Sequence, residues 1–208
     1  MSLLARIALV EDRSEASNPG RISVEWLRYA THFPLWPACL AAGLVGSVVW
    51  VAVRPSFWPI PVLALALNLW YWHRVRLRFR FGCVNASKVV SMKPFMLAVF
   101  TDLTTGEDQP PYPVIKILAH PFPRGSHYGI GDKCATVAMY TGSAEAEHWE
   151  GFDPVMVDCA TSDNSAIEHL IQTIPTEEWS ELEAGLKNLP QPLKQGTYPL
   201  NRGGAGRS

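Results

Sequence analysis

The chain has 208 residues, 48% of them hydrophobic, and a formal net charge of −1. This near-neutral total hides an asymmetry, because residues 1–81 contain nine basic and four acidic residues whereas residues 82–208 contain nine and fifteen. The acidic C-terminal part argues against a nucleic-acid-binding protein, and four cysteines without a CxxC pair argue against a disulfide-rich secreted protein.

The N-terminal segment, residues 1–33, is expected to lie in the cytoplasm. Residues 1–21 have mixed charge and an Asn-Pro-Gly break, so they should be weakly ordered. Residues 22–33 have apolar side chains at helical spacing and are followed by Pro34, which predicts a short amphipathic helix. This helix would lie either at the membrane interface or against the soluble domain.

Two uncharged apolar runs, residues 35–53 and 57–72, are separated by only three residues. As a helix, the first run is about 28 Å long, which matches a bilayer hydrocarbon core of about 30 Å. The second run is shorter, so it would cross with tilting or local thinning of the bilayer, or else re-enter the same face. The pattern predicts a two-helix transmembrane hairpin over residues 34–73, with a buried hairpin in a soluble protein as the alternative.

Aromatic and basic residues indicate where the two runs should meet the membrane surface. The turn between the runs holds one basic residue and each flank holds four, so both termini should lie on the cytoplasmic side of the cytoplasmic (inner) membrane. The basic flank after the second run should attract anionic lipid head groups. The predicted lipid-contacting residues are Trp36, Trp58, Trp70, Trp72, Arg74, Arg76, Arg78 and Arg80.

Residues 74–81 alternate strictly between arginine and apolar side chains, which is the period of a β-strand. We therefore expect the second apolar helix to give way to a strand within residues 72–75. Val75, Leu77, Phe79 and Phe81 would lie on the apolar face of this strand and begin the soluble core. The arginines on its other face would meet lipid phosphate or an acidic partner.

The C-terminal domain is expected to be α+β and to span residues 74–190. Four further β-rich segments with no helix between them predict an antiparallel β-sheet or a small OB-like barrel. A helical period then predicts two C-terminal helices, the first capped by Ser162 or Asp163 and the second beginning at Pro175-Thr176. Residues 191–208 should form a flexible tail. The four segments are residues 95–103, 114–119, 134–140 and 154–160.

Three residues are candidates for catalysis, although each also has a structural explanation. Cys159 ends a predicted strand and precedes a capped helix, whose N-terminus can lower the pKa of a thiol. Asp158 opposes that effect, and cysteine is common in protein cores. His127 and Asp132 lie in a Pro/Gly-rich loop of residues 120–132, in which the glycines fit a turn.

Metal and cofactor sites are not expected. His120, His127 and Cys134 are metal-capable residues that recur at intervals of seven. However, no CxxC or HxxxH pair supports them, and no phosphate- or dinucleotide-binding motif is present.

The order of hairpin, basic segment and small β-domain resembles a family of uncharacterised bacterial membrane proteins that carry a domain of unknown function. The resemblance rests on residues 94–103, on the Gly131-Asp132 turn with residues 136–140, and on residues 148–161. It extends over residues 74–200 and implies no catalytic residue. A weaker likeness is to NfeD-like proteins, which place an OB-type barrel after membrane helices, but this chain has two predicted spans and two terminal helices.

The leading functional hypothesis is a non-catalytic, membrane-anchored cytoplasmic interaction or scaffold module, because no convergent set of acid, base, nucleophile or metal ligands is visible. The alternative is a membrane-tethered enzyme or small-ligand-binding domain that uses the loop of residues 120–132 and Cys159. A third alternative is a subunit of a transport complex, which the scarcity of polar residues in the apolar runs disfavours. The expected partners are the anionic bilayer and either a protein partner or a second copy of the chain.

Overall fold

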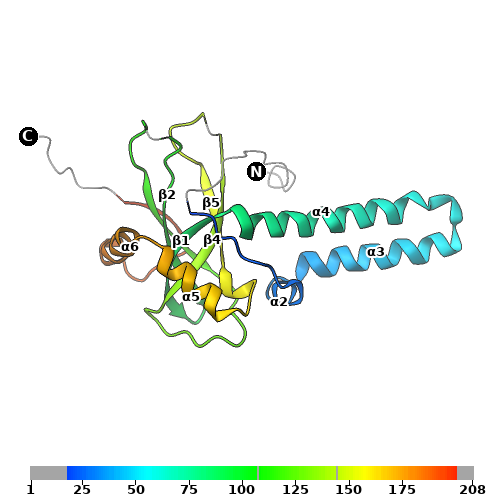
Figure 1. Ribbon diagram of the computed structural model, residues 1–208, viewed down its shortest axis with the longest axis horizontal. Helices are drawn as coiled ribbons and strands as arrows, with labels where there is room; N and C mark the ends of the chain where they lie inside the picture. The colour runs from blue at the N-terminus through cyan, green and yellow to red at the C-terminus, as the bar shows by residue number, and fades with distance from the viewer. Residues whose placement is uncertain (1–17, 107, 144, 201–208) are drawn as a thin grey trace, which may run out of the picture.

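A computed structural model describes residues 18–106, 108–143 and 145–200 of the chain. A six-stranded sheet with helices packed on it forms one end of the molecule, and two long helices project from it side by side (Figure 1). The stretch predicted to be weakly ordered falls mostly on residues 1–17, outside the described residues. The elements are α2 (Trp26–His32), α3 (Leu35–Val53), η1 (Pro55–Phe57), α4 (Pro59–Phe81), β1 (Cys83–Met92), β2 (Phe95–Asp102), β3 (Pro113–Ala119), β4 (Lys133–Thr141), β5 (Gly151–Met156), η2 (Val157–Cys159), α5 (Asn164–Thr173), α6 (Thr176–Asn188) and β6 (Gly196–Pro199).

The projecting arm consists of α3 and α4, which are joined by the 3-10 helix η1 (Figure 1). α3 has 19 uncharged residues, and it is the one helix in the described part of the chain that is long and apolar enough to cross a membrane. α4 packs along α3, and the side-chain amide of Asn68 donates a hydrogen bond of 3.1 Å to the carbonyl oxygen of Leu40. Both apolar runs are therefore helical.

The strand predicted over residues 74–81 is wrong, because α4 continues through this segment to Phe81. Val75 and Phe79 are buried, with 6% and 0% of their surface exposed, and they lie one helical turn apart. Because Val75 and Phe79 are four residues apart, a helix also places both side chains on one face, and this face contacts the domain. The arm and the domain share one continuous helix.

The end of α4 is completed by residues that precede the arm in the chain. The last carbonyl groups of a helix have no partner within it and need donors from elsewhere. The backbone N–H of Ile22 donates to the carbonyl oxygen of Phe79 at 3.0 Å, and that of Arg21 donates to Arg80 at 3.2 Å. This long-range pairing favours a helix here over a strand.

The sheet is antiparallel throughout, with the strand order β5-β4-β1-β2-β3-β6, and it curls into a half-barrel. The antiparallel prediction is confirmed, but β5 and β6 remain at the two edges, so the sheet is not a closed OB-like barrel. Two contacts cross the inside of the curl. Lys116 of β3 donates from its Nζ to the carbonyl oxygen of Phe152 in β5. The N–H of Met156 donates to Nε2 of His120 at 3.2 Å.

Most predicted strands agree with the structure, and the differences lie at the ends of the domain. β2, β3 and β4 correspond to three of the predicted segments. The segment of residues 154–160 ends earlier, because the chain turns into η2 at Val157. β1 was not predicted, since Asn85, Ser87 and Lys88 interrupt its apolar pattern.

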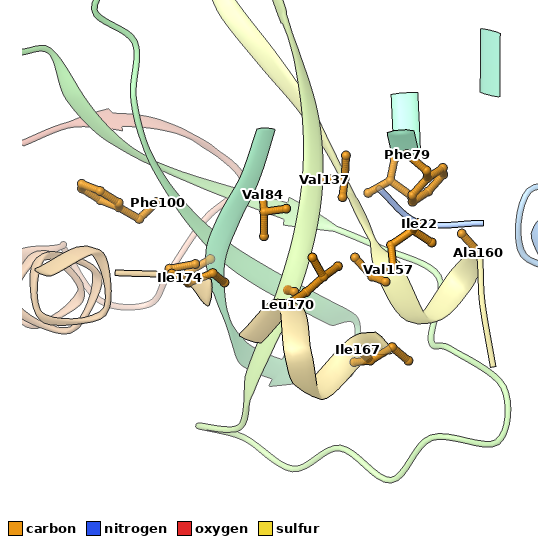
Figure 2. Close-up of a cluster of buried hydrophobic side chains, with 14 of the residues drawn as sticks. Ile22, Phe79, Val84, Phe100, Val137, Val157, Ala160, Ile167, Leu170 and Ile174 are labelled. Carbon is orange, nitrogen blue, oxygen red and sulfur yellow. The ribbon is translucent and has the colours of Figure 1, made fainter. Parts of the chain in front are cut away.

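Two layers of apolar side chains hold the domain together. One lies between the sheet and the helices α5 and α6, and the end of α4 packs onto the same cluster (Figure 2). Ile167 and Leu170 of α5 belong to this cluster, together with Val84 and Val137 of the sheet, and Leu170 lies the nearer of the two to these valines (Figure 2). The second layer fills the inside of the curl. The two predicted helices are confirmed, and the side chain of Asp163 caps α5 by accepting a bond of 3.1 Å from Ala166.

Part of the segment predicted as a flexible tail is structured. Residues 196–199 form β6, which pairs with β3 from Val114 to Ile117. The N–H of Leu200 also donates to the carbonyl oxygen of Pro113 at 2.8 Å. Edge pairing with β3 orders this part of the chain, and residues 201–208 lie outside the described residues.

Candidate functional site

The environment of Cys159 disfavours the thiolate form that a nucleophilic cysteine needs. It lies in η2, not at the start of α5, and its side chain is fully buried. Burial, together with the neighbouring carboxylate of Asp158, raises the pKa of the Cys159 thiol to about 12. A protonated thiol is a poor nucleophile, so this residue fits a core position.

His127 and Asp132 are both exposed, and the structure gives Asp132 a local role. Its Oδ2 accepts a hydrogen bond of 2.7 Å from the N–H of Gly129, which closes the turn before β4. Gly131 in this turn has a φ of +96°, a conformation that favours glycine. The loop is therefore a turn entering a strand, as the glycines predicted.

The three metal-capable residues spaced at intervals of seven are not gathered into a metal site. Cys134 is fully buried inside the curl of the sheet, and burial raises the pKa of its thiol. His127 is exposed, whereas His120 is buried. Within residues 18–106, 108–143 and 145–200, no group of three or more His, Cys, Asp or Glu residues could hold a metal ion.

Hydrogen bonds connect the loop of residues 120–132 to Asp158, the neighbour of Cys159, and a residue of α2 takes part in them. Arg28 donates from Nε to the carbonyl oxygen of Asp158 at 2.6 Å and from Nη2 to that of Arg124 at 3.1 Å. Ser126 donates to Oδ1 of Asp158 at 3.1 Å. α2 thus packs on the soluble domain, which was one of the two positions expected for it. These bonds join three segments and give the cluster a structural role.

His120 is a buried histidine that is held in its neutral form. Its Nε2 accepts a hydrogen bond from the N–H of Met156, and its Nδ1 lies 2.9 Å from the carbonyl oxygen of Pro121. Nδ1 therefore carries the proton. Burial lowers the pKa of His120 to about 4, because a second proton on Nε2 would face the Met156 N–H without solvation.

We expect the domain to lose about 2 kcal/mol of its free energy of unfolding between pH 7 and pH 5 because of His120. The folded-state pKa of about 4 lies below the value of 6.5 for a free histidine, so the unfolded chain binds the proton first as the pH falls. Urea denaturation at several pH values should show this loss, and His120→Gln should flatten it. His127→Gln, which alters an exposed histidine, should keep the slope; equal slopes for native and His120→Gln chains would contradict the assignment.

The predicted lipid-contacting tryptophans lie on the arm with much of their surface uncovered. Trp36, Trp58 and Trp70 are 49%, 65% and 44% exposed. Trp72, nearer the domain, stacks on Trp26 of α2 with ring centroids 5.6 Å apart. The four tryptophans therefore divide between the free surface of the arm and the junction with the domain.

The four arginines do not share one face, because α4 is helical and not extended there. Arg78 turns to the domain and forms an ion pair of 3.0 Å with Asp153 of β5. Arg76 lies over the ring of Trp26 at 4.5 Å, and Arg74 lies 5.8 Å from the ring of Trp70. The predicted basic row is thus spread around the helix where the arm meets the domain.

A cavity of about 270 Å³ lies where the sheet opens between β1 and β2. The ladder between these strands runs from Met92 opposite Phe95 to Ser87 opposite Val99. Beyond that point, β1 continues beside β4 and β2 continues beside β3. Side chains from both separated strands, from β4 and from the first turns of α6 line the opening.

Three of the residues that line this cavity form a polar network. Thr101 of β2 and Tyr140 of β4 share a hydrogen bond of 2.7 Å between their hydroxyl groups. Asn85 of β1 donates from Nδ2 to the Thr101 hydroxyl at 2.9 Å. Asn85 is only 2% exposed, and its Oδ1 has no hydrogen-bond partner among the described residues.

Four of the residues lining the cavity are acidic. Glu177, Glu178 and Glu181 reach it from α6, and Asp102 reaches it from the end of β2. Oε2 of Glu178 is buried and likewise has no hydrogen-bond partner among the described residues. Burial raises the pKa of Glu178, an effect that a contact with the Ala86 backbone partly offsets.

Sequence reasoning missed this cavity. Its polar residues come from three strands and one helix, and only the strand register brings Asn85, Thr101 and Tyr140 together. The available signal was weak: single polar residues at positions where a strand is otherwise apolar, as at Asn85 between Val84 and Ala86. Buried polar residues of this kind need partners, so they point to a network.

Comparisons with known proteins found two similarities. A family model described as "Protein of unknown function (DUF3239)" matches residues 74–190. A crystal structure described as that of "a putative membrane protein from Corynebacterium diphtheriae" is similar with 20% sequence identity and a TM-score of 0.48, covering 56% of this chain and 99% of that one. A search of curated proteins found no match.

Proposed function

Because the chain belongs to a family of proteins of unknown function (DUF3239), its role must be argued from its own residues, and we propose that it is a membrane-anchored, non-catalytic binding module. In this proposal, α3 and α4 cross the cytoplasmic membrane as a hairpin with both termini in the cytoplasm. The α+β domain is held at the membrane surface, where it binds a protein partner or a second copy of the chain.

The observation that carries the proposal is the uncovered apolar surface of the arm. Large apolar side chains are exposed along the length of both helices. Such a large apolar surface is unfavourable in contact with water. A bilayer would cover both helices at once, since α3 alone spans about 28 Å and the apolar part of α4 lies beside it. Examples are Val45, Val49, Val53, Val62, Leu63 and Leu69, which are 64%, 61%, 71%, 58%, 62% and 64% exposed.

The junction between arm and domain supports placement at a lipid surface. Tryptophan rings favour the interfacial region of a bilayer, and arginines favour anionic head groups. Trp26, Trp72 and Arg76 gather there, with Trp26 between the other two. Because Arg78 pairs with Asp153, it would hold the domain against the helix, leaving the other arginines nearer to lipid.

The domain chemistry supports binding more than catalysis. Burial is the main cause that raises the pKa of all three thiols in the domain, those of Cys83, Cys134 and Cys159, so each is held as a protonated thiol. The alternative role, an enzyme or ligand-binding domain using Cys159 and the loop of residues 120–132, would need a more acidic thiol. Purification of the full chain from membranes in mild detergent tests the binding role: a stoichiometric protein partner or a defined oligomer supports it, and a monomer without partner contradicts it.

We expect the double variant Val45→Arg, Leu63→Arg to leave the membrane fraction. An arginine at the centre of a spanning helix costs about 3 kcal/mol on insertion scales. The two positions lie at similar depth, given the contact between Leu40 and Asn68, and both side chains are exposed. Alkaline carbonate extraction of membranes should retain the native chain in the pellet and release the double variant.

The matched control is Ile130→Arg, which places an arginine on an apolar residue that is 71% exposed and lies in the loop before β4, outside α3 and α4. This variant should stay in the membrane pellet. Release of the native chain by carbonate, or equal retention of the double variant and Ile130→Arg, would show that the arm is not a membrane anchor.

A further inference from the structure

We propose that the exposed face of α2 enters the lipid surface beside the arm, so that α2 is a second contact with the bilayer and fixes which side of the domain faces it. This inference rests on the proposed function, because it takes α3 and α4 as spanning helices. It adds to that function an interfacial helix and a defined orientation of the domain.

Two constraints place α2 at the depth where the apolar part of the arm begins (Figure 1). At its end, only Phe33 and Pro34 separate α2 from α3. At its start, Trp26 stacks on Trp72 of α4, with ring centroids 5.6 Å apart. Trp72 ends the uncharged run of α4, and the arginine-rich segment follows it. Both ends of α2 therefore lie at the level where a bilayer that covers the arm has its surface.

α2 has an inner face that packs on the domain and an outer face that nothing in the described chain covers. Tyr29 and His32 are buried against the domain. Leu27 is 85% exposed, the highest value among the large apolar residues of the described chain, and Trp26 is 47% exposed. Leucine and tryptophan on the free face of a helix are residues that an interfacial helix inserts into lipid.

The apolar surface of α2 continues onto the arm. Leu35 and Trp36, the first two residues of α3, are also exposed. Lipid and protein can both cover an apolar face, but the position of this one beside the spanning helices selects lipid. A bilayer that covers the start of α3 also reaches α2, since two residues separate the helices.

The charges around α2 favour an anionic lipid surface. Arg76 is exposed and lies over the ring of Trp26 at 4.5 Å, and Arg124 is exposed on the loop that α2 contacts. The carboxylate of Glu25, just before α2, is bound by the domain instead. Its Oε1 accepts hydrogen bonds from the N–H of Ser162 at 2.6 Å and from the Ser162 hydroxyl at 2.7 Å. Basic groups close to a membrane surface are attracted to anionic head groups.

Because α2 is fixed to the domain, insertion of its free face defines how the domain sits on the bilayer. Arg28 donates to the carbonyl oxygens of Asp158 and Arg124, at 2.6 Å and 3.1 Å. The N–H of Glu25 donates to the carbonyl oxygen of Ala160 at 2.7 Å. The side of the domain formed by η2 and the start of the loop of residues 120–132 thus faces the lipid. α6 lies at the opposite end of the molecule from the arm and faces away (Figure 1).

The test is fluorescence quenching of the full chain in vesicles of phosphatidylcholine and phosphatidylglycerol, with the fluorophore NBD on single introduced cysteines. The background is Cys39→Ala, which removes the exposed native cysteine, and this chain without an added cysteine gives the labelling blank. The labelled variants are Leu27→Cys in α2, Val45→Cys in the arm and Ala184→Cys in α6. All three positions are exposed, so cysteine there leaves the packing of the domain unchanged.

Nitroxides near the lipid head group should remove about half of the emission at position 27, since an interfacial helix lies about 5–10 Å into the boundary of head groups and acyl chains. They should leave position 184 unchanged. Nitroxides near the end of the acyl chain should quench position 45, which reports on the arm alone. If position 45 is quenched and position 27 is quenched no more than position 184, this inference is overturned and the anchor stands. Absence of quenching at position 45 overturns the anchor, and this inference with it.

Discussion

Replacing Phe79 with alanine should lower the free energy of unfolding of the domain by about 4 kcal/mol, as is usual for a fully buried phenylalanine. Phe79 is 0% exposed and packs edge-on against the ring of Tyr29, with centroids 6.0 Å apart. It lies among Ile22 and Val137 where α4 enters the core (Figure 2). Alanine would leave a cavity where the end of α4 packs into the core of the domain.

The matched control is Phe81→Ala, two residues further along α4. Phe81 is 38% exposed, so its loss should cost less than about 1 kcal/mol. Urea denaturation of the full chain in detergent, followed by circular dichroism, would measure both variants. On a strand, Phe79 and Phe81 would share one face and the two variants would lose similar stability, so comparable losses would contradict the helix.

Gly82→Ala is expected to destabilise the domain by about 3 kcal/mol, at the upper end of the usual cost of overpacking. A Cβ on this residue would lie 2.5 Å from the carbonyl oxygen of Arg78 and 2.8 Å from that of Ala138. Both atoms belong to backbone, in α4 and β4, so neither can move aside without shifting an element. The close approach of α4 to β4 depends on the absence of a side chain here.

Gly129→Ala is the control for this prediction, because its Cβ would meet only the side-chain Oδ2 of Asp132, at an ordinary 3.6 Å. It should change the free energy of unfolding by less than about 0.5 kcal/mol. Thermal denaturation of both variants in the same detergent gives the comparison. A Gly82→Ala chain as stable as Gly129→Ala would mean that α4 and β4 are further apart than described.

Both predictions concern the end of α4, where the sequence pattern wrongly predicted a strand. Residues 74–81 repeat with a period of two, yet Val75 and Phe79 are also one helical turn apart, so the apolar pattern fits both structures. Donors from Arg21 and Ile22 favour the helix, because they bond the carbonyl groups at its end. A local pattern contains no information about partners that come from another part of the chain.

The candidate site shows the same limit. Cys159 follows a strand and precedes a helix capped by Asp163, as expected, but its burial depends on packing inside the curl of the sheet. Burial raised the pKa of the thiol where proximity to a helix start would have lowered it. The cavity went unnoticed, since Asn85 and Glu178 are brought together only by the register of β1 and the packing of α6.

Features that depend on neighbours in the chain were readable from the residues alone. These are the apolar helices of the arm, the basic-to-acidic change in charge, three of the strands and the two C-terminal helices. They follow from periodicity and capping, which act over a few residues. The end of α4, the missed strand β1, the pairing of β6 and the lining of the cavity required the folded chain. Each depends on hydrogen bonds or burial between residues far apart in sequence, which no local pattern encodes.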